Sequence, residues 1–145
     1  MTAPLTPAAM RDHLEAEGVA ASGFAAFLGI QVVHCWDGEC ELSLEVRRDL
    51  TQSFQTLHGG VYAALADIVS GFAAYSRVGP VVTADLATQM IAPAAAGRTV
   101  RAIASITSVK GRHVVVTSRL YVDDDLESET IAISVARLVV LTQSP

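Results

Sequence analysis

The chemistry-bearing residues of this chain gather in one stretch, where His58, Gly59 and Gly60 precede an almost wholly apolar segment with a single carboxylate, Asp67. An ionised carboxylate inside an apolar helix is costly unless water, a polar pocket or a cation surrounds it. Asp67 therefore either faces a polar pocket, as a base or nucleophile, or caps a loop or pairs with an arginine. On the first reading Asp67 is the candidate catalytic residue.

The spacing of apolar residues over 58–75 predicts one long helix that the rest of the chain must wrap. Val61, Leu65 and other apolar residues recur every three or four positions. The segment approaches the roughly 20 residues needed to cross a bilayer. The central Asp67 and the nearby Gly71 fit a soluble core helix better, so no membrane span is expected.

The chain before this helix predicts two short helices and a hairpin. Residues 7–17 and 23–28 have helical character, and Gly18 is expected to end the first helix. Two alternating strands, 30–36 and 40–46, flank the strong turn signal Asp37-Gly38. The first strand is expected to direct four residues to its apolar side: Ile30, Val32, His34 and Trp36.

After the helix, four further strands are predicted with short connections. They cover residues 81–91, 99–109, 113–122 and 129–141, with an acidic turn at Asp123-Asp124-Asp125. Short connections favour antiparallel pairing of neighbouring strands. The predicted class is α+β, with a curved antiparallel sheet around one long central helix. We expect an N-terminal segment over 1–22 and a single domain over 23–145.

Composition limits the partners that this protein can take. Of the 145 residues 51% are hydrophobic and only 17% are charged, so either another subunit covers part of the surface or the composition is merely rich in alanine and valine. A net charge of -5 argues against general nucleic-acid binding. With no secretory signal, Cys35 and Cys40 are expected to be reduced thiols in a cytoplasmic protein.

Several motifs together resemble the hotdog-fold acyl-CoA thioesterases, in particular the phenylacetate-pathway and 4-hydroxybenzoyl-CoA thioesterase group. The resemblance covers nearly the whole chain after Gly23. The residues that carry it are Leu28-Gly29-Ile30, Gln52, Leu57-His58-Gly59-Gly60, Asp67 and Ala92-Pro93-Ala94. The chain departs from the family pattern at Gln55, where members often have glycine.

This resemblance implies a hotdog fold and hydrolysis of an acyl- or aryl-CoA thioester without a cofactor. The residue matching Asp67 is the family's nucleophile or general base, and the helix N-terminus polarises the thioester carbonyl. Gln52 matches an asparagine or glutamine near the reacting carbonyl and water. Thr83 matches a serine or threonine near the site.

Elementary chemistry agrees with this reading. Thioester hydrolysis needs a polarised carbonyl and an activated water or nucleophile, while a thiolate leaves with little protonation help. We expect free N–H groups at Gly59 and Gly60, at the positive end of the helix, to polarise the carbonyl. At 1.5 Å per residue, however, Asp67 lies roughly 13 Å from His58. The spacing therefore predicts a site shared between two subunits, in a dimer or a tetramer of paired dimers.

Other residues have weaker signals. His58 can serve as a base or fix the turn by binding its backbone, and we expect the second role. Lys110, Arg112 and His113 are candidates for the nucleotide phosphates of coenzyme A, although a solvated turn fits them equally well. His34 is expected to be a satisfied or interface histidine.

No spacing of His, Cys, Asp and Glu resembles a metal site, and no nucleophile elbow surrounds a serine. Two alternatives to the thioesterase remain open. One is a non-catalytic acyl-CoA or acyl-carrier binding protein. The other is a hotdog dehydratase or hydratase, although the polar motif of that class is not evident.

Overall fold

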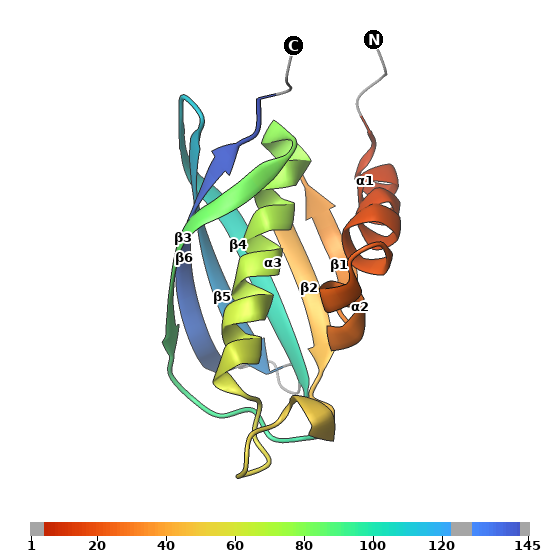
Figure 1. The fold of residues 1–145 in the computed structure, drawn as a ribbon, viewed down its shortest axis with the longest axis vertical. Coiled ribbons are helices and arrows are strands. Elements are labelled where there is room, and N and C mark those ends of the chain that lie inside the picture. Colours follow the sequence, from red (N-terminus) through yellow and green to blue (C-terminus); the bar gives the residue numbers. More distant parts are fainter. Residues whose placement is uncertain (1–4, 123–128, 143–145) are drawn as a thin grey trace.

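A computed structural model describes residues 5–122 and 129–142, and in it one curved sheet wraps one long helix (Figure 1). The sheet has six antiparallel strands in the order β1-β2-β4-β5-β6-β3. The elements are α1 (Pro7–His13), η1 (Leu14–Ala20), α2 (Gly23–Leu28), β1 (Gln31–Trp36), β2 (Glu39–Glu45), η2 (Arg48–Leu50), α3 (Gly59–Val78), β3 (Val81–Met90), β4 (Thr99–Lys110), β5 (His113–Val122) and β6 (Thr130–Val140). The predicted α+β hotdog architecture is confirmed.

Helix α3 is the predicted central helix, and it runs three residues beyond the predicted end at Tyr75. Its sheet-facing side is fully buried, with Leu65, Val69 and Ala73 at 0% exposure. Figure 1 shows α3 on one face of the sheet, with α1 and α2 beside β1 and with β3 at the opposite edge. Asp67 lies away from this core, on the half-buried side of the helix.

The predicted hairpin forms around Asp37-Gly38. Both turn residues have positive φ angles, 46° and 90°, which is typical of the type I′ turn that joins two strands tightly. The predicted inward position of His34 is wrong, because the register shifts between Val32 and His34, whereas Trp36 packs against the core as expected. One extra residue turns the following side chains over, so Cys35 is buried and His34 is exposed.

Gly18 does not end the first helix, contrary to expectation. Helix α1 continues into a π-helical segment, η1, that runs through Gly18 to Ala20. A Cβ on Gly18 would lie 2.7 Å from Cζ of Phe72 on α3. The glycine therefore allows close approach to a neighbouring helix rather than marking a stop signal.

No helix in the described ranges is long and apolar enough to cross a membrane. The predicted acidic turn at Asp123-Asp124-Asp125 lies outside the described residues.

Candidate active site

The carboxylate of Asp67 is held by one side-chain hydrogen bond. The Thr83 hydroxyl on β3 donates to Asp67 Oδ1 over 2.6 Å. In the part of the chain that the structure describes, no lysine or arginine forms an ion pair with Asp67. The alternative reading of Asp67 as half of an internal ion pair is therefore excluded, and its second oxygen is left to accept a proton from a ligand or water.

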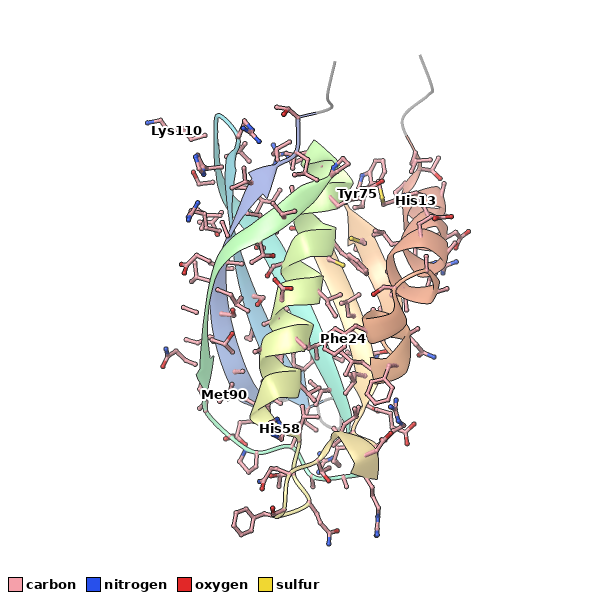
Figure 2. The ribbon with its side chains drawn as sticks, in the orientation of Figure 1. His13, Phe24, His58, Tyr75, Met90 and Lys110 are labelled. Carbon is pink, nitrogen blue, oxygen red and sulfur yellow. The ribbon has the colours of Figure 1, made fainter. Side chains whose placement is uncertain are left out.

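Asp67 opens onto a pocket of about 510 Å³ beside α3. Asp67, Gly71 and Tyr75 follow one another at four-residue spacing, which places them along one side of the helix. Residues of the N-terminal segment and Phe24 of α2 also line this pocket. Figure 2 shows Phe24 and His13 reaching toward α3 from that side. The pocket is mainly apolar, not polar as we expected. A half-buried carboxylate in an apolar pocket is a typical general base or nucleophile.

His58 caps α3 and occupies one of the two expected backbone donors. Its Nδ1 accepts from the Gly60 N–H over 2.9 Å, which satisfies the turn-fixing role that we expected for this residue. The expectation of a free Gly60 donor is therefore wrong. Within the described residues the Gly59 N–H makes no hydrogen bond. Gly59 is therefore the donor that remains at the positive end of the helix.

The loop before His58 is tied together by its own side chains. The amide of Gln52 donates to the Thr56 hydroxyl over 2.7 Å and its carbonyl accepts from the Phe54 N–H over 3.0 Å. Gln55 has φ of 58°, the left-handed conformation that glycine adopts most easily. Gln55 therefore adopts a backbone conformation that a glycine at this position would adopt with less strain. Both polar groups of Gln52 serve the loop in this structure.

The Ala92-Pro93-Ala94 motif pins this loop to the start of α3. The Leu57 N–H donates to the Ala94 carbonyl over 2.8 Å, and the Tyr62 hydroxyl donates to the Ala92 carbonyl over 2.9 Å. Burial raises the pKa of Tyr62, so its hydroxyl keeps the proton that makes this bond. The motif positions the helix N-terminus.

Lys110, Arg112 and His113 lie at the tip of the β4–β5 hairpin, far from His58 in the same chain (Figure 2). Arg137 on β6 joins them, with its Nη1 3.4 Å from His113 Nδ1. Sequence reasoning missed Arg137 because cross-strand pairing, not sequence distance, brings it there. Lys110, Arg112 and Arg137, beside His113, form a local cationic cluster on an acidic protein.

Among the described residues, neither the two cysteines nor a metal site offers an alternative to Asp67. Cys35 and Cys40 are buried free thiols, and burial raises the pKa of Cys40 well above its usual value. A thiol with a raised pKa is a poor nucleophile at neutral pH. Among the described residues, no group of three His, Cys, Asp or Glu side chains is placed to hold a metal ion.

Sequence reasoning did not connect two residues of the pocket wall. His13 was not singled out, and Tyr75 was assigned only to the apolar stripe of the helix, yet the two are hydrogen-bonded and line the same pocket as Asp67. Sixty-two positions separate them in sequence. No local pattern links residues so far apart.

Comparisons with known proteins identify a family match and structures of the same fold. The model of the thioesterase superfamily matches residues 54–129, just over half of the 145 residues. A search of curated proteins finds no match.

Several solved structures share the fold. A mutant of the phenylacetic acid degradation protein PaaI from Thermus thermophilus is 28% identical, over 83% of this chain and 100% of its own, with a TM-score of 0.76. A thioesterase family protein from Silicibacter pomeroyi is 25% identical, over 92% and 99% of the two chains, with a TM-score of 0.83. Zebra fish thioesterase superfamily member 2, at 22% identity over 94% and 99%, also has a TM-score of 0.83.

Proposed function

The chain belongs to the thioesterase superfamily, and from this premise we propose that it hydrolyses an acyl- or aryl-CoA thioester to the free acid and coenzyme A. The observation that carries the proposal is the Asp67 carboxylate, which faces a pocket, accepts a hydrogen bond from Thr83 and has no cationic partner in the described chain. Such a carboxylate is available to act on a ligand.

Asp67 can promote hydrolysis by two routes. As a general base, it takes a proton from water while the resulting hydroxide attacks the carbonyl carbon. As a nucleophile, it attacks that carbon itself and forms an anhydride, which water then cleaves. In both routes the C–S bond breaks and coenzyme A leaves as a thiolate. The hydroxyl of Thr83 donates to Oδ1, and we propose that Oδ2 is the oxygen that acts on water or the substrate.

The carbonyl oxygen gains negative charge during the attack and needs a donor. We assign this role to the Gly59 N–H at the start of α3, because the neighbouring Gly60 N–H is taken by His58. Within one chain Gly59 and Asp67 are eight residues apart, about 12 Å at 1.5 Å per residue. That distance is too long for one reacting carbonyl, so the proposed site needs a second subunit.

Strand β3 supplies a surface for that second subunit. It forms the sheet edge, and seven of its ten residues are exposed. The exposed residues include the large apolar Val82 and Met90. A long apolar edge strand is a template for strand pairing, and a two-fold axis is the commonest symmetry of such pairs. We propose that two β3 strands pair antiparallel in a dimer, from which a tetramer of paired dimers can be built.

We propose one register for this pairing, argued from two contacts within the chain. Thr83 contacts Asp67, while a Cβ on Gly59 would lie 3.3 Å from Met90 Sδ. Pairing Thr83 with Met90 of the partner subunit therefore brings Asp67 level with Gly59 of the partner subunit. The two-fold axis then passes between Leu86 and Ala87.

The same axis exchanges the two ends of the molecule. The hairpin tip with Lys110, Arg112, His113 and Arg137 lies at the end of the molecule opposite His58 (Figure 2). The proposed two-fold axis brings the helix start of the partner subunit to the same end as this tip. We propose that this cationic cluster binds the phosphates of coenzyme A. The buried free thiols Cys35 and Cys40 support a cytoplasmic location, where coenzyme A thioesters are made and used.

Release of free thiol from a panel of short, medium, long and aromatic acyl-CoAs tests the proposal. We expect hydrolysis of at least one member and its loss in Asp67→Asn. Tight binding without thiol release would instead identify a non-catalytic acyl-CoA or acyl-carrier binding protein. Hydration of an unsaturated acyl-CoA would identify a hydratase.

A further inference from the structure

Two thiols that the proposed mechanism leaves unused lie side by side in the first hairpin. Cys35 on β1 and Cys40 on β2 are direct cross-strand partners, and both are free cysteines. The chain has no other cysteine. Both side chains are buried, with 0% exposure for Cys35 and 3% for Cys40. Two thiols in this arrangement are either small core side chains or a dithiol that can be oxidised.

The two-residue turn decides which kind of cross-strand pair the cysteines form. Trp36 and Glu39 flank the Asp37-Gly38 turn and are paired across it. In a two-residue hairpin this closing pair exchanges backbone hydrogen bonds, and the next pair along the ladder exchanges none. Cys35 and Cys40 are that next pair. Such a pair has its Cα atoms about 4.5 Å apart, within the range of about 4.4–6.8 Å that a disulfide spans.

The two sulfur atoms lie on the inner face of the sheet and interact with each other. Cys35 Sγ donates to the Phe72 carbonyl of α3 over 3.3 Å. Burial and, to a smaller extent, a side-chain hydrogen bond with Cys35 raise the pKa of Cys40 well above its usual value. Cross-strand partners have their side chains on the same face of a sheet. The thiols therefore face one another beneath α3.

Joining the two sulfurs needs no additional space in the core. An S–S bond of about 2.05 Å is shorter than a non-bonded contact, and two hydrogen atoms leave when it forms. The change removes the thiol hydrogen that Cys35 donates to Phe72. Because Phe72 lines the pocket beside Asp67, the oxidation state of the pair alters a contact behind the pocket wall.

We propose that Cys35 and Cys40 form a reversible disulfide across the β1–β2 hairpin when the protein meets a low-molecular-weight disulfide such as oxidised glutathione. Strand β1 lies at an edge of the sheet and is held to it by β2 (Figure 1). The disulfide therefore fastens this edge strand to its neighbour. In a reducing compartment the pair stays as two thiols.

The reaction is thiol–disulfide exchange in two steps. A thiolate of the pair attacks one sulfur of oxidised glutathione, which breaks that S–S bond, gives a mixed disulfide and releases one glutathione thiolate. The second cysteine then attacks the protein sulfur of the mixed disulfide, forms the bond between Cys35 and Cys40 and releases the other glutathione thiolate. Two electrons pass from the cysteines to glutathione, and the two thiol protons pass to the released thiolates.

The equilibrium between thiols and disulfide in glutathione buffers tests this proposal. Exchange of buried thiols in the folded protein needs local opening of the hairpin and is slow. The oxidised chain is therefore made in guanidinium chloride, where both thiols are accessible, and then refolded. Equilibrium is approached from the oxidised and the reduced protein, and the disulfide fraction is measured by acid quenching and mass spectrometry.

The same equilibrium constant is measured for the native protein and for the chain in guanidinium chloride. Because the native hairpin holds the thiols face to face, we expect the constant to be roughly 10–40-fold larger for the native protein, the effect of closing a short loop. A native constant equal to or below that of the denatured chain would overturn the proposal. Failure of the oxidised chain to refold, or disulfides that link separate molecules instead, would overturn it as well.

The matched control moves one thiol by a single position. The double variant Cys40→Ala with Glu39→Cys changes the loop in the unfolded chain by only one residue. Successive residues of a strand face opposite sides of the sheet, and Glu39 is exposed where Cys40 is buried. The moved thiol points away from Cys35, so this variant should show no native preference for the disulfide. An equal preference in this variant would refute the role of the cross-strand pair.

Discussion

Replacing Asp67 by asparagine separates a catalytic carboxylate from a structural one. The amide has nearly the same size, and its carbonyl can still accept the hydrogen bond that Thr83 donates over 2.6 Å. The change weakens a charge-assisted hydrogen bond to a neutral one, a loss of about 1 kcal/mol. For a chain of this size the melting temperature should fall by only about 2–4 °C.

The effect on the rate should be much larger. Loss of a general base typically slows a reaction about 10²–10⁴-fold, which corresponds to about 3–5 kcal/mol of barrier height. Thermal melting and thiol release should be measured on the same preparation. Asp12→Asn is the control, because Asp12 forms an exposed pair with Arg11 outside the pocket, and it should leave both readings unchanged.

Two results would refute this reasoning. A folded Asp67→Asn variant with kcat near that of the wild type would show that the carboxylate does no chemistry. A destabilisation of roughly 3–5 kcal/mol would show instead that Asp67 compensates a buried charge in the assembled protein.

Three other changes address the remaining parts of the site. His58→Ala removes the helix cap and should cost about 1 kcal/mol of stability in thermal melting; a loss of activity beyond about 10²-fold in the folded variant would point to a base instead. Val82→Glu places a charge on the β3 edge and should lower dimer content in sedimentation and kcat together, whereas a fully active monomer would refute the shared site. Lys110→Ala with Arg112→Ala should raise KM for acyl-CoA roughly 3–10-fold with kcat little changed. Arg11→Ala is the control, because Arg11 is an exposed cation on α1, and an unchanged KM in the double variant would exclude the hairpin tip as the phosphate site.

The sequence was sufficient for features that depend on local patterns. The 3–4 spacing around Asp67 predicted α3, and Asp37-Gly38 predicted the first hairpin, because helix periodicity and turn chemistry are properties of neighbouring residues. The pocket position of Asp67 beside Thr83 followed from one charge in an apolar helix together with the family resemblance.

Features that depend on packing were missed. A bulge after Val32 turned His34 outward, and nothing in the alternation of apolar residues signals where an extra residue enters a strand. Gly18 was assigned to a helix end, although its small size serves contact with Phe72. The Gly60 N–H was expected to be free. It donates instead to Nδ1 of His58, and this bond depends on the side-chain rotamer of His58, which the sequence does not indicate.

The contact between Gly18 and Phe72 gives the pocket an adjustable width. Because a methyl group on Gly18 would overlap the ring of Phe72, any larger residue there must displace that ring, and both residues border the space beside Asp67. A larger side chain at position 18 would thus change the width of the pocket, and with it the range of acyl groups that fit, without altering the groups that bind or activate the thioester. In a protein library, variation at this one position would sort variants by the bulk of the substrates they accept.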